Sequence, residues 1–591
     1  MLRTRGRRPR GKARDQKSIC RLPPVEFCRY SGIKEEMRMK PLLSMKSAQD
    51  LDRELQAAYH FAQDGLMEIA SLRLWEQIKK VLETHAEKRG IKAQQLSVAA
   101  ICGKGDNAGD ALAVLRHARM EGYEKLHAVL PPSETLKENA RLNYERGLQA
   151  GIRYQYWAQD RLDSLADFLK SMDVIIDAVL GTGVRGPAEG QAAEMIGLLN
   201  TVSANGYLPA AMRPLVLSID IPSGLGDMWK ADYPCVRADM TFCIFPLKEA
   251  LFMPDARRYA GTVIPIHGVF PKEDSVKKAR AFIEDTDQLA SLLPPVMPWA
   301  HKMQRGRVAI LAGSMNGAGA ALHCVRGAAA AGAGYIALFC DSELFSPFLS
   351  AAGDRAIVRP YSEENFKPEE WDVVIAGPGW GRTQERKMQL ERVLASDVAL
   401  VLDADGLRLF ANLAESRMNP SVRNRSESGS SSAPLVLLPH PGEMKDLLKV
   451  VAGSSGMSLP ADQVLSVSSQ FGAVVALRAV TTHIAKPGGP CIVHDGFSPG
   501  LGIAGSGDVL AGIAGGLLAR WIAFRRVEHL ANATGGEVLV QDAFHAVRAG
   551  VLAHSQAGRM LFHERGWFSP ADIADSCSRL LSQNGAGNAE I

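Results

Sequence analysis

The sequence predicts an α/β protein made of two doubly wound domains. Two series of short apolar runs alternate with amphipathic segments, one before and one after a proline-rich stretch. Strands that alternate with helices in this way are typical of parallel βαβ units. The chain has 591 residues, which is more than one hydrophobic core normally holds. Its 55 glycines and 46% hydrophobic residues match a folded α/β protein rich in tight turns.

Charge and cysteine usage exclude several classes of protein. Lys and Arg number 68 against 64 Asp and Glu, a balance that predicts no nucleic-acid or membrane-surface partner. Nine cysteines without a C-x-x-C pair argue against a disulfide framework and a structural zinc site. No run reaches the roughly 18 to 20 apolar residues of a membrane span. We therefore expect a cytoplasmic protein, and we expect it to form a homo-oligomer.

Residues 1–40 are predicted to be a disordered basic extension. The stretch is rich in arginine and has no periodic apolar face. It is acid-poor, which also fits an organelle transit peptide, but it has few serines and no amphipathic pattern. Met37 or Met39 is a natural start for the folded protein.

The first domain is predicted over 41–285. A helical lead-in at about 47–90 precedes apolar runs that read as strands separated by helical segments. These runs are LSVAAIC, LHAVL, MDVIIDAVLG, LVLSIDIPSG and ADMTFCIF.

The second domain is predicted over 286–591, after a proline-rich linker at 291–304 that can continue neither a helix nor a strand. Its elements lie in RGRVAILAGS, AALHCVRGAAAAGAGYIALF, WDVVIAGPGWG, LVLDADGL, PLVLLPHPGEM and GSGDVLAGIAGGLLARW. Two polar segments, 415–434 and 524–542, are predicted surface excursions.

The first domain carries polar groups after three of its strands. In ICGKGDNAGDALAVLR a strand runs into a glycine-rich turn that opens a helix, so backbone N–H groups and the helix dipole suit a dinucleotide pyrophosphate. Alternatively, the glycines merely make a tight turn. Asp177 and the second glycine-rich loop follow another strand, and Asp220 and Ser223 follow a third. Open α/β sheets bind ligands at such carboxyl ends.

These motifs, in this order, resemble the epimerase domain of the NAD(P)H-hydrate repair enzymes, with its pattern G-x-G-N-N-G-G-D, D-A-x-x-G-T-G and D-I-P-S-G, across about 45–275. The resemblance implies a Rossmann-like three-layer sandwich that interconverts the R and S hydrates of NADH and NADPH. It implies that Asp220 is the general acid/base, and that Asn107, Asp177 and Ser223 hold a potassium ion (K+). The substrate contacts that it implies are Asp106, Asn107, Ala108, Gly109, Asp110, Gly181, Thr182, Gly183, Val184, Arg185, Gly186, Pro187 and Asp220.

Two positions depart from that pattern. Asp106 stands where the family usually has Asn, and Ala108 where it usually has Gly. An added carboxylate weakens contact with a phosphate and strengthens binding of a cation, two effects that oppose each other. A non-catalytic, nucleotide-binding N-terminal domain is therefore a second hypothesis.

In the second domain, SPGLGIAGSGD supplies backbone N–H groups at the start of a helix predicted from Val509. A carboxylate beside bound phosphate is useful if it takes the proton from a hydroxyl that then attacks a phosphoryl group. Asp508 is therefore the predicted base. Alternatively, Asp508 only favours the helix dipole.

Gly-Ser-Gly-Asp at a helix start is similar to the signature of the ribokinase-like fold. With HKMQRGRVAILAGS, AGPGWGR, LDADGL and LLPHPGEM it resembles the dehydratase domain of the same repair family, across about 295–582. The resemblance implies dehydration of the S hydrate with ADP, giving NAD(P)H, AMP and phosphate; ATP is the alternative nucleotide, and Mg2+ is expected with it. His440 and Glu443 are predicted to orient substrate or water-bound magnesium. The implied hydrate contacts are Ala320, Gly381, His440 and Asp508, and the implied nucleotide contacts are Lys486, Pro487, Gly488, Gly489, Pro490 and Gly507.

The loop before Gly-Ser-Gly-Asp also departs from the family pattern G-N-P-G-M-A-T-G. Phe497 and Ser498 replace Asn, and Ile503 and Ala504 replace Thr and Gly, changes expected to weaken nucleotide binding or slow loop closure. An alternative function is that of a ribokinase-like kinase for a small alcohol, which would release a stable phosphorylated product and has no need of the first domain.

Overall fold

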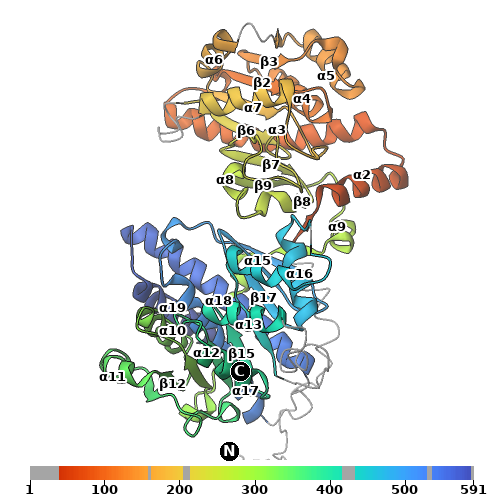
Figure 1. The fold of residues 1–591 in the computed structure, drawn as a ribbon. Coiled ribbons are helices and arrows are strands. Elements are labelled where there is room, and N and C mark those ends of the chain that lie inside the picture. Colours follow the sequence, from red (N-terminus) through yellow and green to blue (C-terminus); the bar gives the residue numbers. More distant parts are fainter. Residues whose placement is uncertain are drawn as a thin grey trace, which may run out of the picture.

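The computed structural model describes residues 39–157, 162–203, 213–415, 433–454, 456–528 and 536–586. Two α/β units, each with its own sheet, stack on one another (Figure 1). The prediction of two α/β units built on parallel sheets is confirmed. Residues 1–38 of the predicted extension lie outside the described residues, whereas Met39 is buried and Lys40 already pairs with Ile283.

The first unit is a seven-stranded parallel sheet in the order β4-β3-β2-β5-β6-β7-β9. Its apolar strands bury both faces, as parallel sheets do. The helices α3, α4 and α5 cover one face, and α6 and α7 cover the other. The strands are β2 (Val98–Cys102), β3 (Leu126–Leu130), β4 (Arg153–Tyr156), β5 (Val174–Ala178), β6 (Leu215–Ile219), β7 (Met240–Ile244) and β9 (Thr262–Ile266). The helices are α3 (Gln63–Arg89), α4 (Asp106–Met120), α5 (Glu138–Gln149), α6 (Leu162–Lys170) and α7 (Gly190–Ser203).

The second unit is a twelve-stranded mixed sheet, ordered β13-β12-β11-β14-β15-β16-β17-β18-β19-β10-β1-β8. Seven neighbouring strands from β13 to β17 are parallel, and β18 and β19 form an antiparallel hairpin. The strands are β11 (Arg307–Leu311), β12 (Tyr335–Cys340), β13 (Ile357–Pro360), β14 (Val373–Ala376), β15 (Ala399–Leu402), β16 (Leu435–Leu437), β17 (Val474–Leu477), β18 (Thr481–Ala485) and β19 (Cys491–Asp495).

Helices cover both faces of this larger sheet. On one face lie α10 (Ala318–Ala330), α17 (Ser506–Val527), α18 (Gly536–Arg565) and α19 (Pro570–Ala586). On the other lie α12 (Gln384–Leu394), α13 (Asp405–Glu415), α15 (Pro441–Lys449) and α16 (Pro460–Phe471). The further helix α11 (Phe345–Ala352) packs beside β13.

Three strands of the larger sheet come from the N-terminal part of the chain. They are β1 (Lys40–Leu43), β8 (Leu247–Lys248) and β10 (Ala281–Ile283), which extend the sheet beyond β19. β10 pairs with β19 through Phe282 and Ile492, and α2 (Met45–Tyr59) follows β1 back to the first unit. The two units therefore share backbone hydrogen bonds as well as side-chain contacts.

The glycines of helix α17 allow it to pack closely against α10. It lies against α10 so closely that a methyl group on Gly512 would approach the carbonyl oxygen of Cys324 to 2.1 Å. By length and composition, α17 is also one described helix that could cross a membrane, but 67% of the apolar window is buried in the protein. Its apolar residues are used in the core of the second unit.

Three local predictions need correction. Helix α17 begins at Ser506 rather than Val509. Residues 524–527 and 536–542 belong to α17 and α18, so the described part of the predicted excursion at 524–542 is largely helical. The linker at 291–304 is anchored, because Leu292 and Leu293 are buried. Residues 416–432 of the other excursion lie outside the described part.

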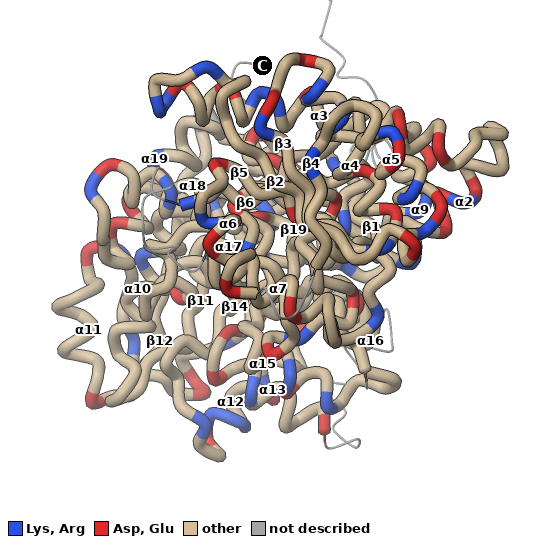
Figure 2. The backbone as a smooth tube through the Cα atoms, turned by 90° about the horizontal axis from the view of Figure 1, so that it is seen from above, with Lys and Arg blue, Asp and Glu red and all other residues tan. Residues whose placement is uncertain are grey.

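Charged residues and cysteines are distributed over both units. Basic and acidic residues alternate over the described chain without a large region of one sign (Figure 2). The seven cysteines within the described ranges are all buried and unpaired.

Candidate active sites

The carboxyl ends of the strands in the first unit open into a cavity of about 990 Å³. This volume lies at the upper end of small-molecule sites and suits an extended ligand. The loop Gly181–Pro187 lines it throughout, as do Asp106, Asn107, Asp110 and Asp220. Helix α2 adds a wall that was not predicted, with Gln49 donating to the carbonyl of Thr182 at 2.8 Å.

Asp220 occupies a strained position at the end of β6. Its φ of 60° is unusual for any residue other than glycine, and such strain often marks a functional site. The carboxylate oxygen Oδ1 accepts hydrogen bonds from the backbone N–H of Ile244 at 3.0 Å and from Lys248 Nζ at 2.5 Å. The side chain is thus held at one oxygen while facing the cavity.

Lys248 is a residue that the sequence analysis missed. It belongs to β8, a two-residue strand of the second unit's sheet, and its side chain reaches the cavity of the first unit. Burial lowers the pKa of Lys248, but the carboxylate of Asp220 more than offsets that effect, and the pKa is raised. The lysine therefore stays charged beside Asp220. No apolar periodicity could have found it, because β8 is too short to show one.

Several carboxylates share the cavity with Lys248. Burial, followed by the nearby carboxylates of Asp220, Asp106 and Asp52, raises the pKa of Asp110 well above its ordinary value. Burial also raises the pKa of Asp52. An acid that holds its proton can donate it to a ligand. The site can thus both accept and supply protons.

Asn107, Asp177 and Ser223, the three predicted potassium ligands, converge around the carbonyl of Leu180. Asn107 Nδ2 donates to that carbonyl at 3.0 Å, and Ser223 Oγ lies 3.1 Å from it. Ser223 Oγ also donates to Asp177 at 2.5 Å. Carboxylate, amide, hydroxyl and carbonyl oxygens are the donors that hard cations prefer. The described residues contain no cluster of three His, Cys, Asp or Glu side chains that could hold a metal ion.

Two predicted substrate contacts need correction. Ala108 is fully buried in α4, and its N–H donates to the carbonyl of Gly105 within the helix. Gly109 also donates to Gly105 and faces Met67, where a methyl group would approach the sulfur to 2.7 Å. Gly109 packs α4 against α3, and neither residue lines the cavity.

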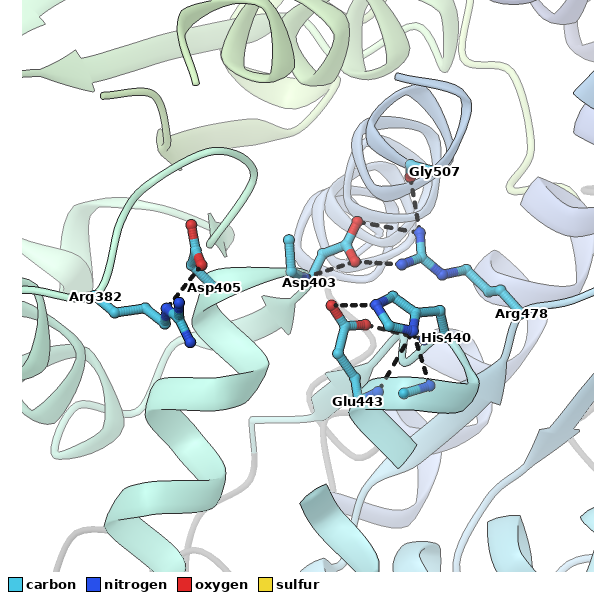
Figure 3. A network of polar contacts seen from close by, with 9 residues as sticks. Arg382, Asp403, Asp405, His440, Glu443, Arg478 and Gly507 are labelled. Atoms are coloured by element: carbon cyan, nitrogen blue, oxygen red, sulfur yellow. Dashed lines mark hydrogen bonds and ion pairs between the residues drawn. The ribbon is translucent and has the colours of Figure 1, made fainter. Parts of the chain in front are cut away.

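In the second unit, Asp508 lies in the first turn of α17, close to a buried ion pair. Arg478 donates to both oxygens of Asp403, and its Nη1 donates to the carbonyl of Gly507 at 3.0 Å (Figure 3). Burial, and then the carboxylate of Asp403, raise the pKa of Asp508 to about 6, while Arg478 acts in the opposite direction. A carboxyl with a pKa near neutral is well matched to general base catalysis. Asp403 and Arg478 were not predicted as site residues, although Asp403 lies in the quoted LDADGL motif.

The turn before Asp508 requires glycine. Gly505 caps α17 with a φ of 93°, and a methyl group there would approach His323 to 2.6 Å. In the first turn of α17, the N–H groups of Ser506 and Asp508 donate to the carbonyls of Ile503 and Gly505. The N–H of Gly507 and the helix dipole favour a bound anion at this end of the helix. Asp508 thus stands beside a place suited to phosphate.

His440 caps α15 at the same edge of the sheet. Its ring nitrogen Nδ1 accepts from the backbone N–H of Gly442 at 2.9 Å, and its backbone N–H donates to Oε2 of Glu443 at 3.0 Å (Figure 3). Burial raises the pKa of Glu443 to about 7 and lowers that of His440. The imidazole is half exposed, and its outer nitrogen Nε2 lies 3.2 Å from Oε1 of the buried Glu443.

Ala320 and Gly381 are brought together by two close loops. The methyl group of Ala320 lies against Gly379, and the N–H of Gly381 donates to Asp405 at 2.8 Å. Both loops follow parallel strands, β11 and β14, so they share an edge with Asp403 and His440. The predicted hydrate contacts are therefore neighbours in the fold.

The predicted nucleotide contacts at Lys486–Pro490 need correction. β18 runs antiparallel to β17, with Leu477 opposite His483 and Val475 opposite Ala485. Lys486 therefore follows β18 at the amino edge of the sheet, whereas Arg478 and Gly507 lie at the carboxyl edge. Lys486, Pro487, Gly488, Gly489 and Pro490 form a hairpin turn away from Asp508, and only Gly507 of that predicted set is at the site.

Family models of known proteins match both units. Residues 308–579 match the family model described as NAD(P)H-hydrate dehydratase, and residues 63–250 match the model described as YjeF-related protein N-terminus. A solved structure of an ADP/ATP-dependent NAD(P)H-hydrate dehydratase from Bacillus subtilis, co-crystallised with ATP and Mg2+, is 21% identical. It covers 51% of this chain and 97% of that chain, with a TM-score of 0.39.

Full-length relatives match across both units. A bifunctional NAD(P)H-hydrate repair enzyme from Thermofilum pendens is 30% identical over 536 residues, covering 87% of this chain and 91% of the relative. One of the same description from Escherichia coli is 28% identical over 494 residues, covering 82% and 84%. The chain therefore belongs to the family of bifunctional NAD(P)H-hydrate repair enzymes.

Proposed function

We propose that this protein repairs hydrated NADH and NADPH in two steps, one in each unit. The first unit interconverts the R and S hydrates in the cavity that contains Asp220. The second unit dehydrates the S form with ADP or ATP, and ADP is the nucleotide we favour. The observation that carries the proposal is the pair of separate sites, each at a carboxyl sheet edge and each with an aspartate placed for proton transfer.

Epimerisation requires a proton to leave and return at the substrate. Asp220, held by Lys248 through one oxygen, keeps the other free for that proton. The protonated form of Asp110 supplies a hydrogen-bond donor in the same cavity. Asn107, Asp177 and Ser223 would hold a potassium ion, which would add positive charge beside the nucleotide. The backbone of Gly181–Pro187 would then contact the nucleotide itself.

Dehydration starts with phosphoryl transfer in this proposal. Asp508 takes the proton of the ring hydroxyl, and the oxygen attacks the terminal phosphorus of ADP, so AMP leaves. The new phosphate ester is a good leaving group. Its C–O bond breaks as an adjacent C–H proton is lost, which restores the reduced nicotinamide and releases phosphate.

Other residues orient the participants of the second reaction. Arg478 binds both Asp403 and the carbonyl of Gly507, so it holds the first turn of α17, which carries Asp508, next to Asp403. His440 and Glu443, which lie 3.2 Å apart, would together orient the hydrate or the waters of a magnesium ion carried by the nucleotide. Ala320 and Gly381 leave room for the substrate ring.

Two matched variants of the full chain test the proposal on pure hydrates. Asp508→Asn should abolish return of reduced-nicotinamide absorbance from the S hydrate, while chiral chromatography still detects epimerisation. Asp220→Asn should do the converse. Regeneration at the parent rate by Asp508→Asn would disprove its role as base, and a stable phosphorylated product would indicate a small-alcohol kinase instead.

A further inference from the structure

A short segment of the N-terminal part of the chain is built into the second unit. It follows Lys248 as η6 (Glu249–Phe252) and α8 (Arg257–Ala260), and it lies at the junction of the two units (Figure 1). Phe252 and Ala256 are buried in the same core cluster as Leu400. The carbonyl of Phe252 accepts from Thr481 Oγ1 at 2.7 Å. The segment therefore has a fixed position against β18 and β19.

Arg257, on this segment, makes an unusually complete set of contacts with the end of β19. Its Nε donates to both oxygens of Asp495 at 3.0 Å, and its Nη2 donates to Oδ2 at 2.8 Å. Its Nη1 donates to the carbonyl of Gly261 at 2.6 Å. The guanidinium also lies over the ring of Phe497, 4.5 Å from its centre. Only 5% of Arg257 is exposed, so water competes little with these contacts.

Asp495 and Phe497 begin the loop that leads to Asp508. This loop continues through η11 (Pro499–Leu501) to the Gly505 cap of α17. On its other side, Leu501 packs against Gly558 of α18, and the carbonyl of Gly496 accepts from Arg559 at 3.4 Å. The backbone of Phe497 has a φ of 29°, a strained value for a residue with a side chain. Such a conformation persists only where its surroundings hold it, and Arg257 is part of those surroundings.

We infer that Arg257 is a positioning residue for the nucleotide site of the second unit. By fixing Asp495 and stacking on Phe497, it sets the position of the loop whose far end presents N–H groups to phosphate. A residue of the N-terminal part of the chain thus contributes to dehydration without touching the reactants. The inference rests on the proposed binding of nucleotide at this loop. It also accounts for Phe497, since an aromatic ring supplies the face on which a guanidinium stacks.

The test compares Arg257→Met and Arg257→Lys in the full chain with Arg258→Met as the matched control. Arg258 is the next residue but is exposed and contacts only Tyr259 among the described interactions. Both Arg257 variants should raise the Kd of ADP and its KM in dehydration by about three- to thirtyfold, with little change in kcat. Lysine should fail to rescue, because it lacks the planar fork that pairs with a carboxylate. The epimerisation rates of both Arg257 variants should match that of the parent protein. Arg258→Met should match the parent in ADP affinity, dehydration and epimerisation.

A double-variant comparison separates positioning from general destabilisation. If Arg257 acts through Asp495, then Arg257→Lys combined with Asp495→Asn should raise the Kd of ADP no more than the larger single effect. This pair also serves if Arg257→Met does not fold. Parent-like ADP affinity in folded Arg257 variants, or additive effects in the double variant, would overturn the inference alone. Failure of the parent protein to bind any adenine nucleotide would overturn the proposed function, and the inference with it.

Discussion

The acidity of Asp508 gives a pH dependence that can be worked out in advance. A base must be deprotonated to act, and burial together with Asp403 raises the pKa of Asp508 from 3.8 to about 6. About nine-tenths of the carboxyl is then ionised at pH 7 and about one-tenth at pH 5. The kcat/KM for dehydration of the S hydrate should therefore fall about tenfold between these values. With an ordinary pKa of 3.8, the fall would be only about 6%.

The assay follows the return of reduced-nicotinamide absorbance with the pure S hydrate at several pH values. Enzyme-free samples at each pH supply the background. Bound phosphate adds negative charge beside Asp508, so the inflection should lie at about 6 or above. A profile that is flat from pH 5 to pH 8 would refute the reasoning.

The Asp403→Asn variant checks the cause of the shift. Removing a carboxylate beside Asp508 stabilises its charged form, so its pKa should fall and the inflection should move to lower pH. An unchanged inflection would show that Asp403 does not govern Asp508.

Three further predictions concern the other site and the core. Lys248→Met should reduce epimerisation by tenfold or more, which corresponds to a loss of about 1.4 kcal/mol, and should leave dehydration by the second unit unchanged. Equal loss of both activities, or loss of neither, would contradict its role. Potassium removal should slow epimerisation measured by chiral chromatography, with sodium as the control ion; Ser223→Ala should weaken that response, and a parent-like response would count against the proposed ligand set. Gly512→Ala should destabilise the protein by about 1–3 kcal/mol because the added methyl group meets the carbonyl of Cys324. Gly197→Ala in α7, which has open space around it, should stabilise the protein by up to about 1 kcal/mol. Thermal unfolding compares the two variants, and equal shifts in their unfolding temperatures would refute the packing argument.

The sequence predicted those parts of the sites that depend on strand ends. Asp177, Asp220 and Asp508 each follow an apolar run or open a helical one, so their places at a sheet edge could be inferred from parallel topology. Arg478 directly follows the apolar strand β17, so the same reasoning would have applied to it, but Lys248 could not be inferred in this way. Lys248 lies on a two-residue strand whose partner, β1, is about 200 residues away in the chain, and sequence periodicity carries no information on such pairing.

The nucleotide contacts predicted at Lys486–Pro490 failed for a related reason. The pattern of apolar residues indicates a strand but not its direction. Because β18 runs antiparallel to β17, the turn after it lies at the amino edge of the sheet, opposite the edge that carries Asp508. Likewise, Ala108 and Gly109 lie in a motif that lines the cavity, but on α4 Ala108 is buried and Gly109 faces Met67 of α3. Motif membership therefore located the sites, while helical phase and strand direction decided which residues line them.

The most direct test of the two-step repair uses the purified full chain and a mixture of R and S NADH hydrates. Reduced-nicotinamide absorbance is followed with ADP, with ATP and with neither. Two working sites predict complete conversion of both hydrates when a nucleotide is present and none without it. A halt once the S hydrate is consumed would contradict an active first site, and no return of absorbance with either nucleotide would contradict the account as a whole.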